Sequence, residues 1–368
     1  MEIKVESLVQ KGVGLARKPD GKVVFIDKVL PGEVVDIKIT KEKKDYDNAV
    51  CTRIITPSPS RITPICPYYG LCGGCNLMHV EYKAQIAYKE NMIKDTFNHF
   101  KIKSEEFSES VESSPLEYRT RVRFKCGKSE LGFSKSNSRD FVSISNCPVL
   151  DKQLNDFNPK LKKFENRGFV SAFLSDDGPV YDFDFHPVTV LDKVLFVSNR
   201  VFFQSNLSLL GKMISYVKSN VIGPKIMDLY SGIGTFSAFL EDDFEVTAVE
   251  QNTYCLQLAR KHLKNTNFFT GKVEDYNFKG KFDTVIVDPP RVGLDKKVPM
   301  LMQKVNAKRI IYVSCDVVTL SRDLSKLQDL GYSIKSIKLF DLYPQTHHIE
   351  TVVLLSNLNS SEKNPVNG

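Results

Sequence analysis

The sequence lacks both a long hydrophobic run and a secretion signal. No apolar stretch in its 368 residues approaches the roughly 18–20 residues that a helix needs to cross a bilayer. The first residues, Met1 to Lys4, do not follow the signal-peptide pattern, which predicts a cytoplasmic location and no membrane partner. Internal repeats are absent as well, and the absence of heptads and of an exposed apolar stripe predicts a monomer.

The composition is that of a globular protein with more than one domain. At 368 residues, with 42% hydrophobic and 26% charged residues, the chain is long enough for two or three domains. Lysine and arginine number 51 against 44 acidic residues, and the resulting charge of +7 is spread thinly along the chain. Such a charge is compatible with a nucleic-acid partner without demonstrating one. Eight cysteines in a chain without a secretory signal favour metal binding or catalysis over disulfides.

Residues 1–57 predict a small β-barrel. Five short β-like runs are separated by turn signals, at residues 5–9, 13–17, 23–29, 34–40 and 49–56. Lys41, Lys43 and Lys44 fall on a loop, where they suit contact with a nucleic-acid backbone, although a solvated turn is the alternative. Residues 56–60 are typical of a linker.

Residues 58–198 predict a mixed α+β domain with a cysteine-rich loop at 66–75 and a helix over 81–100. One β-like run, over residues 118–125, is rich in basic residues. Because side chains alternate along a strand, four of them share one face: Arg119, Arg121, Arg123 and Lys125. RNA bound against this face is one interpretation, and a solvated face is the other.

Residues 199–357 predict a Rossmann-like α/β domain. Strands and helices alternate there, as in a doubly wound parallel sheet. The strands are expected at residues 225–229, 246–249, 267–270, 284–287, 309–313 and 333–340, with a last run at 351–355. Residues 358–368 are polar and predict a disordered tail.

A glycine turn follows the first of these strands and indicates a cofactor site. The run from Asp228 to Phe236 contains Gly232 and Gly234, and Glu250 lies 18 residues after Gly232, at the end of the next strand. A carboxylate at that place accepts hydrogen bonds from the ribose hydroxyls of an adenosine cofactor. The third glycine of the dinucleotide fingerprint is missing, which favours S-adenosylmethionine over NAD.

Asp288 begins an Asp-Pro-Pro-Arg sequence at the end of the fourth strand. Ligands bind at this edge of an open parallel sheet, and the two prolines make the rim rigid, although a purely structural turn is the alternative. Amino-methyltransferases that act on adenine usually carry an aromatic residue after such a diproline. The chain has Arg291 there, which disfavours methylation of an exocyclic amine.

Two further residues fit a reaction at a pyrimidine C5. Cys315 ends the fifth strand, and a thiolate that adds to C6 of the base makes C5 nucleophilic. Glu350 precedes the last strand and is a candidate base for the C5 proton that must leave after methylation. Taken singly, a cysteine there is more often a buried hydrophobe, and Glu350 a surface carboxylate. His347 and His348 suit a structural or RNA-contact role better than metal binding, since neighbours on a strand face opposite ways.

The cysteine-rich loop has the spacing of a metal site. Cys66, Cys72 and Cys75 form a C-x5-C-x2-C pattern, and Cys147 can supply a fourth thiolate. Zinc and a [4Fe–4S] cluster both accept four thiolates, and the spacing alone does not separate them. A fourth cysteine favours a closed structural site over the open cluster of radical enzymes. Three cysteines remain outside this pattern and are read as neutral or core residues: Cys51, Cys126 and Cys255.

Together these residues resemble the RNA 5-methyluridine methyltransferases of the TrmA/RumA (RlmD) family over nearly the whole chain. The barrel looks like an OB-like TRAM domain, the four cysteines look like the [4Fe–4S] ligands, and residues 202–206 look like the F-F-Q-x-N entry to the catalytic domain. The resemblance implies that Cys315 is the nucleophile and Glu350 the base. It implies that S-adenosylmethionine is bound by Gln204, Tyr230, Gly232, Thr235, Glu250 and Asp288. Thr235 stands where bacterial relatives often have asparagine, and either Glu274 or Asp275 reaches the adenine edge.

The implied activity is methylation of C5 of a uridine in RNA, with ribosomal RNA favoured over the T-loop of tRNA. The base is expected to flip out of its stack so that C6 becomes accessible. Two rival interpretations remain. An iron–sulfur RNA-binding protein without catalysis would not bind S-adenosylmethionine. A zinc-stabilised enzyme that methylates a protein or an amine would not need Cys315.

Overall fold

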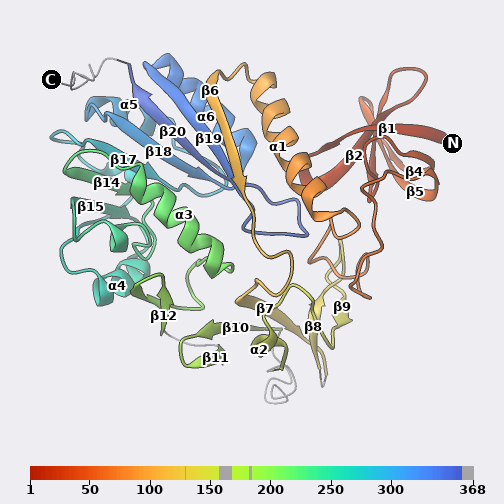
Figure 1. The fold of residues 1–368 in the computed structure, drawn as a ribbon, viewed down its shortest axis with the longest axis horizontal. Helices are drawn as coiled ribbons and strands as arrows, with labels where there is room; N and C mark the ends of the chain where they lie inside the picture. The colour runs from red at the N-terminus through yellow and green to blue at the C-terminus, as the bar shows by residue number, and fades with distance from the viewer. Residues whose placement is uncertain (129, 157–167, 182–184, 359–368) are drawn as a thin grey trace. The chain divides into compact units, whose positions relative to one another are not determined.

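The computed structural model describes residues 1–128, 130–156, 168–181 and 185–358 (Figure 1). Contacts divide the chain into two compact units. The first contains Met1–Lys94, Ser113–Ser171 and Tyr343–His348. The second contains Asp95–Glu112, Ala172–Leu342 and Ile349–Gly368. Part of the tail predicted to be disordered, residues 359–368, lies outside the described residues.

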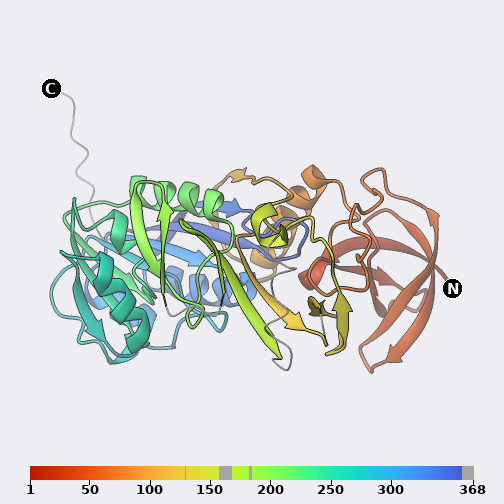
Figure 2. The same cartoon turned by 90° about the horizontal axis from the view of Figure 1, so that it is seen from below.

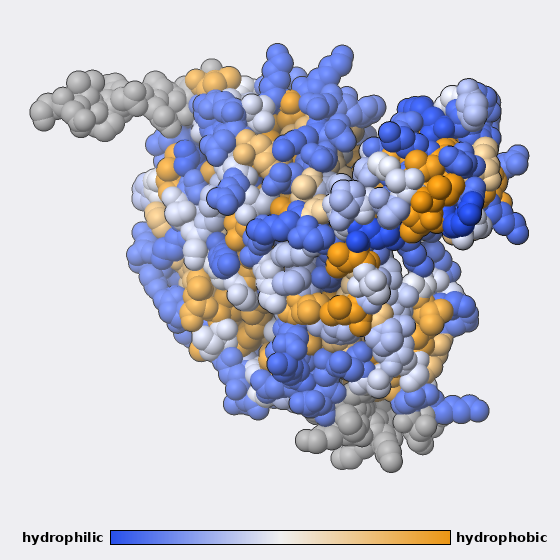
Figure 3. Space-filling model, turned by 45° about the vertical axis from the view of Figure 1, so that its right-hand side comes forward, coloured by the Kyte–Doolittle hydropathy of each residue, from blue (hydrophilic) through white to orange (hydrophobic). Residues whose placement is uncertain are grey.

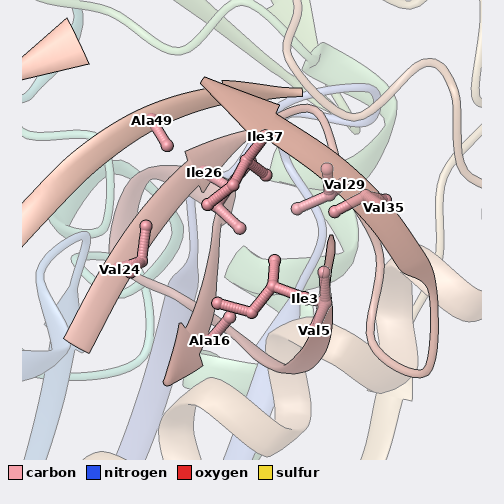
Figure 4. Packing of buried hydrophobic residues seen from close by; sticks show 9 residues of the cluster. All are labelled: Ile3, Val5, Ala16, Val24, Ile26, Val29, Val35, Ile37 and Ala49. Atoms are coloured by element: carbon pink, nitrogen blue, oxygen red, sulfur yellow. The ribbon is translucent and has the colours of Figure 1, made fainter. Parts of the chain in front are cut away.

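The first unit begins with the predicted barrel. Five strands close in the order β1-β2-β3-β5-β4, with bounds β1 (Glu2–Val9), β2 (Val13–Arg17), β3 (Val23–Asp27), β4 (Val34–Glu42) and β5 (Tyr46–Thr56). Buried and exposed residues alternate along β1 and β4, which is the period-2 pattern of a strand with one face inside. Figure 4 shows the interior filled by small aliphatic side chains from several strands, namely Ile3, Val5, Ala16, Val24, Ile26, Val29, Val35, Ile37 and Ala49. The predicted five-stranded barrel is confirmed.

The rest of the first unit surrounds the cysteine loop. The predicted helix is α1 (Tyr82–His99), which begins and ends within one residue of the expected bounds. An antiparallel meander follows, made of β7 (Arg121–Cys126), β8 (Leu131–Ser134) and β9 (Phe141–Ser143), and then α2 (Lys152–Asp156). A 3-10 turn, η1 (Gln10–Gly12), joins β1 to β2.

The basic strand is shorter than the sequence predicts. Because β7 begins at Arg121, Arg119 is not part of it, and the backbone of Arg119 forms an isolated bridge with Leu150 instead. Within β7 the basic residues alternate with buried Val122 and Phe124, as expected. They do not form a uniform solvated face, because Arg121 is withdrawn from solvent and burial lowers its pKa.

The second unit is built on an eight-stranded sheet in the order β16-β15-β14-β17-β18-β20-β19-β6. The strands are β6 (Ser104–Val111), β14 (Lys225–Leu229), β15 (Glu245–Glu250), β16 (Asn267–Thr270), β17 (Thr284–Val287), β18 (Arg309–Ser314), β19 (Tyr332–Phe340) and β20 (Glu350–Asn357). The pairs from β16 to β18 are parallel, as predicted.

The expectation of a wholly parallel sheet is wrong at the other end. β20 runs antiparallel to both of its neighbours, β18 and β19, so the sheet is mixed. The physical reason is the connection, since no helix lies between β19 and β20 to carry the chain back across the sheet. The last strand, β6, comes from far upstream and pairs parallel with β19.

Helices flank this sheet, and three of the four named here begin at a capping side chain. The helices are α3 (Leu207–Ser219), α4 (Thr253–His262), α5 (Val298–Lys304) and α6 (Val317–Asp329). Asn206, Asn252 and Asp316 cap α3, α4 and α6 by accepting backbone N–H groups of the first turn. In Figure 2, α3 and α6 lie on opposite faces of the sheet, as in a doubly wound fold.

Further short elements complete the description. Two antiparallel hairpins precede α3 in the chain: β10 (Phe169–Ser175) with β11 (Gly178–Tyr181), and β12 (His186–Val190) with β13 (Lys193–Val197). Short 3-10 turns are η3 (Ser237–Phe239) and η4 (Val273–Asp275). None of the helices in the described ranges combines the length and apolar character of a membrane span. On the face drawn in Figure 3, hydrophobic residues are interspersed among hydrophilic ones.

Candidate active site

The glycine turn after β14 leaves room for a ligand. Tyr230, Gly232 and Gly234 all have positive φ angles, of 60°, 56° and 77°. A Cβ at Gly232 would meet no atom within 4 Å, so the backbone there faces open space. A Cβ at Gly234 would come within 2.5 Å of Leu263, so this glycine is needed for packing. The two glycines therefore have different tasks, and Gly232 is the one beside which a ligand fits.

Glu250 lies beside this turn at the end of β15. Its Oε2 accepts a hydrogen bond from the Gly232 N–H at 3.0 Å, and its Oε1 accepts one from the Asn252 N–H at 2.7 Å. Each carboxylate oxygen has further acceptor capacity, so two hydroxyl groups of a ligand can still donate to it. The structure thus places Glu250 beside the glycine turn, while its predicted contact with ribose hydroxyls stays a prediction.

Two buried polar atoms near the same strand ends make no hydrogen bond within the described residues, Asp228 Oδ1 and Ser231 Oγ. The other carboxylate oxygen of Asp228 accepts a hydrogen bond from Ser237 at 2.6 Å. Burial raises the pKa of Asp228 to about 6, because the charged form loses its water. Buried polar atoms without a partner are rare, and these two lie in or just after β14, next to the glycine turn in the sequence.

Tyr230 and Glu274 lie close enough to influence each other. Burial raises the pKa of the Tyr230 hydroxyl, and the charge of Glu274 raises it further. Glu274 is half-buried, whereas its neighbour Asp275 is exposed. Of the two acidic residues that the sequence left open, Glu274 is the one that faces a predicted cofactor residue.

Gln204 and Thr235 are two more of the predicted cofactor residues. Gln204 is buried, at 8% exposed, in the segment that enters α3. Thr235 is half-buried on the glycine turn itself.

Cys315 and Glu350 lie opposite each other at one end of two paired strands. In the antiparallel pair β18 and β20, Ser314 pairs with Thr351. Cys315 follows Ser314, and Glu350 precedes Thr351, so both extend the pair at the same sheet edge. Asp288 follows β17, the parallel neighbour of β18, at this edge. The antiparallel course of β20 is what brings Glu350 here, since a parallel strand would place its first residue at the opposite edge.

The charges of these residues influence one another strongly. Burial raises the pKa of the Cys315 thiol to about 11, and the carboxylates of Glu350 and Asp288 raise it as well. Burial and the charge of Asp288 hold the pKa of Glu350 well above its usual range, and Glu350 is only 3% exposed. The pKa of Asp288 is raised to about 7 by its withdrawal from water and by the charge of Asp228. A cation beside these buried carboxyl groups would stabilise their charged forms and lower their pKa values.

Arg291 acts on the pKa values of Cys315 and Glu350 in the direction opposite to the carboxylates. It lowers the pKa of Cys315 through its charge and a hydrogen bond, and its charge also lowers the pKa of Glu350. The guanidinium of Arg291 therefore favours the thiolate that nucleophilic attack requires. The sequence identified Arg291 only as a departure from the amino-methyltransferase pattern and missed this effect.

The loop that carries Arg291 is fastened to α6. Thr319 Oγ1 donates to the Arg291 carbonyl at 3.1 Å, and Arg322 Nη2 donates to the Val292 carbonyl at 2.9 Å. The buried carboxylate of Asp323 accepts the Leu294 N–H at 2.7 Å. These three α6 residues were not singled out from the sequence. Their i, i+3, i+4 spacing places them on one face of the helix, and this spacing is a sequence signal by which they could have been found.

The four predicted metal-ligating cysteines line a single cavity in the first unit. The cavity has a volume of about 370 Å³ and is lined by all four thiols, together with Arg119 and Arg123. Burial raises the pKa of Cys75 to about 12, and the charges of the other cysteines add to this effect, whereas Arg119 lowers it. Within the described residues, no three His, Cys, Asp or Glu side chains form a group that could hold a metal ion. The four thiols thus line one cavity, but the described residues do not show a metal site there.

Comparison with known proteins identifies related sequences over most of the chain. The family model described as "tRNA (Uracil-5-)-methyltransferase" matches residues 264–358, the TRAM domain matches residues 1–49, and the "Methyltransferase small domain" matches residues 201–309. An uncharacterized RNA methyltransferase of Thermotoga maritima is 30% identical and aligns with 96% of this chain and 98% of its own. The 23S rRNA (uracil(1939)-C(5))-methyltransferase RlmD of Shewanella halifaxensis is 29% identical over 96% of this chain and 95% of its own.

A solved structure shows the same fold. The Pyrococcus abyssi tRNA (uracil-54, C5)-methyltransferase, in complex with S-adenosyl-L-homocysteine, superimposes with a TM-score of 0.80. It is 23% identical and covers 96% of this chain and 100% of its own. At this identity the likeness concerns the fold, which for this chain is a TRAM barrel followed by a methyltransferase domain.

Proposed function

Because the chain belongs to the S-adenosylmethionine-dependent RNA uracil-C5 methyltransferases, we propose that it methylates a uridine of 23S ribosomal RNA through a covalent bond between Cys315 and C6. The observation that carries the mechanism is the pairing of Cys315 with Glu350 at one sheet edge, beside Asp288. Ribosomal RNA is favoured because relatives matched over nearly their whole length, from Shewanella halifaxensis and Vibrio parahaemolyticus, are named as 23S rRNA methyltransferases. A tRNA target is the second candidate, and the Pyrococcus abyssi structure favours it.

The residues around the glycine turn suit S-adenosylmethionine. When bound, this group supplies an electrophilic methyl group on a positively charged sulfur. Glu250 has acceptor capacity left for the ribose hydroxyls, and Gly232 leaves space for the ligand to approach the backbone. Asp288 is suited to the positive charge, which would lower its raised pKa. We assign the remaining contacts to Gln204, Tyr230 and Thr235, and the adenine edge to Glu274.

Cys315 is proposed as the nucleophile. With a pKa of about 11, it is a thiol at neutral pH and has to lose its proton, which solvent can accept because Cys315 is only half-buried. Arg291 stabilises the thiolate. Addition of sulfur to C6 moves the electron pair of the C5–C6 double bond toward O4. C5 of the resulting enolate would then take the methyl group, whose bond to the sulfonium sulfur breaks and leaves its electron pair on that sulfur.

Glu350 is proposed as the base that completes the cycle. After methylation C5 carries both a methyl group and a proton, and removal of the proton re-forms the double bond and expels the Cys315 thiolate. A carboxylate with a raised pKa is a stronger base than an ordinary one once it is ionised. Its place opposite Cys315 allows both groups to act on the same C5–C6 bond.

RNA contact is proposed for the basic residues of the first unit. Arg123 is exposed and its guanidinium lies 4.3 Å from the centre of the Phe169 ring, an arrangement that also suits a base or a phosphate. Arg119, Arg121 and Lys125 accompany it with less exposure. The TRAM barrel adds Lys41, Lys43 and Lys44, all of which are exposed.

The cysteine cavity is proposed to hold a [4Fe–4S] cluster. Four thiols around one cavity provide the complete ligand set, and a cluster of several atoms needs a space between its ligands that a single zinc ion does not. Arg119 favours the thiolate form of Cys72, Cys75 and Cys147. The cluster takes no step in the methylation, so its role is to fold this part of the chain and to present the RNA-contacting residues.

We expect purified protein, prepared without oxygen, to contain iron and acid-labile sulfide in equal amounts. Cys75→Ser should lose most of both, because a ligand of the closed site is removed. Cys126→Ser is the matched control, since Cys126 is also half-buried in the first unit but does not line the cavity. Elemental analysis and visible absorption measure the outcome. Zinc in place of iron, or equal iron in both variants, would contradict the cluster.

The test of the proposed function uses RNA that contains 5-fluorouridine. Fluorine at C5 cannot leave as a cation, so the reaction stops at the covalent adduct. We expect a protein–RNA adduct with a 23S rRNA transcript and S-adenosylmethionine, and mass spectrometry should map it to Cys315 and identify the nucleotide. An adduct with tRNA transcripts alone would assign the second candidate. The absence of an adduct with either RNA, while S-adenosylmethionine still binds, would refute the covalent C5 mechanism.

A further inference from the structure

The segment that leads into Glu350 is held by hydrogen bonds from buried side chains. Residues 343–348 belong to the first compact unit, whereas the strands on either side of them, β19 and β20, belong to the second. The buried side chains of Lys89 and Tyr118 donate to the carbonyls of Tyr343 and Pro344, at 3.3 Å and 3.0 Å. Two buried side chains therefore hold the start of this segment.

Gln345, in the middle of the segment, is held through both its backbone and its side chain. Its N–H donates to Gln85 Oε1 at 3.0 Å, and its side-chain oxygen accepts from Gln85 Nε2 at 2.9 Å. Its carbonyl accepts the backbone N–H groups of both Asn76 and Leu77, each at 3.0 Å. Gln345 has a φ of 67°, a conformation that costs a non-glycine residue energy and persists where its surroundings enforce it.

Asn76 fastens the end of the same segment. Its Oδ1 accepts the His347 N–H at 2.8 Å, and its Nδ2 donates to His347 Nδ1 at 2.7 Å and to the Lys11 carbonyl at 2.8 Å. One amide side chain thus connects the barrel to the residues just before Glu350. Asn76 also directly follows Cys75, one of the four cysteines around the cavity.

We infer that Asn76 is a positioning residue for Glu350 and links the cysteine loop to the proton-removal step. The inference rests on the proposed function. Only His348 and Ile349 separate His347 from Glu350. Because three steps along the chain join the Cα atoms of His347 and Glu350 and span at most about 11 Å, the place of the His347 backbone restricts where Glu350 can lie.

The consequence is specific to one step. Cys315 is placed by β18 and the start of α6, neither of which depends on Asn76. Loss of the Asn76 hydrogen bonds should therefore leave the addition of Cys315 to C6 and the methyl transfer intact. The removal of the C5 proton should become slower. A merely structural role would lower both steps together, through loss of folded protein.

The experiment follows ordinary uridine-containing RNA and S-adenosylmethionine with a labelled methyl group in a rapid-quench instrument. We expect Asn76→Ala to form the methylated covalent adduct in a burst as fast as that of the wild-type protein. Breakdown of the adduct should be on the order of 10-fold slower, the scale reported for residues that orient a functional group. Asn76→Asp keeps the oxygen that accepts the His347 N–H and should break the adduct down faster than Asn76→Ala does. If Asn76→Ala does not fold, Asn76→Asp is compared with the wild-type protein instead. We then expect Asn76→Asp to form the adduct at the wild-type rate and to break it down more slowly.

Asn155→Ala is the matched control. Asn155 also holds a cysteine of the cavity, since its side chain bonds to the N–H and carbonyl of Cys147 and to the carbonyl of Leu150. It makes none of the hydrogen bonds to residues 343–348 described above, so it should not cause accumulation of the adduct. The inference would be overturned if the adduct of Asn76→Ala broke down at the wild-type rate, or if Asn155→Ala accumulated as much adduct as Asn76→Ala. If the wild-type protein forms no adduct with 5-fluorouridine RNA, the proposed function fails first and the inference falls with it.

Discussion

Replacement of Cys315 by alanine is expected to abolish methylation of the RNA, by on the order of 10⁴-fold or more, the scale seen when a covalent nucleophile is removed. The reason is chemical, since C5 of uracil is too weak a nucleophile to take the methyl group unless sulfur has added to C6. Transfer of labelled methyl groups to the RNA measures the loss. Binding of S-adenosylmethionine should persist, because Cys315 is not among the residues assigned to the cofactor, and calorimetry tests this separately.

The pH dependence of the wild-type reaction follows from the same residue. The Cys315 pKa is raised to about 11, so the thiolate fraction increases with pH throughout the neutral range. Adduct formation should therefore become faster as the pH rises, by up to about tenfold per pH unit where the thiol is mostly protonated. Cys51→Ala is a suitable control, because this cysteine lies in the barrel and its replacement should leave the methylation rate unchanged. A Cys315→Ala variant that still methylates RNA at the wild-type rate would contradict the covalent C5 mechanism and favour an amine of the RNA as the methyl acceptor.

The local pattern of the sequence was enough to predict the barrel and to single out candidate site residues. Alternating side chains and turn signals indicate where short strands lie, whereas the closed order β1-β2-β3-β5-β4 is known only from the structure. Cys315, Glu250 and Asp288 were identified because each ends a strand of a parallel sheet, and parallel strands bring their carboxyl ends to one edge. These are inferences from neighbours in the sequence.

Pairings between distant parts of the chain could not be predicted in this way. The polar sequence of β6 gives no sign that it completes the sheet beside β19, because strand order depends on contacts far apart in the chain. The reversal of β20 was missed for a related reason, although it explains why Glu350 reaches Cys315. Arg119 was placed on a strand by its alternation with other basic residues, but its backbone bridges to Leu150.

The residues that hold the site were the hardest to find. Asn76 and Gln345 match no catalytic motif, and the hydrogen bonds that single them out join distant parts of the chain. The Asn76–His347 and Gln85–Gln345 hydrogen bonds span 271 and 260 residues. The sequence was therefore enough to propose which groups react, whereas the structure was needed to propose which groups orient them.

Glu350→Gln is expected to stop the reaction after methyl transfer, and this variant separates the two halves of the mechanism. Glutamine has almost the same shape but cannot accept the C5 proton. The covalent adduct should therefore form and carry the methyl group, whereas its breakdown should be slower by about 10²- to 10⁴-fold, the usual contribution of a general base. Denaturing electrophoresis after prolonged reaction with labelled S-adenosylmethionine and ordinary uridine-containing RNA should show a stable labelled protein–RNA complex, whereas the adduct of the wild-type protein breaks down and releases methylated RNA.

The wild-type pH profile of this late step provides an independent check. The protonated form of Glu350 cannot act as a base, and burial and the charge of Asp288 raise its pKa, so breakdown of the adduct should be slow at low pH and become faster as the pH rises. In Glu350→Gln this dependence should disappear. Glu245→Gln is the matched control, since Glu245 is exposed at the start of β15 in an ion pair with Lys225 and should leave both steps unchanged. If Glu350→Gln releases methylated RNA at the wild-type rate, another group removes the proton, and Asp288, whose charge also acts on Cys315, becomes the first candidate.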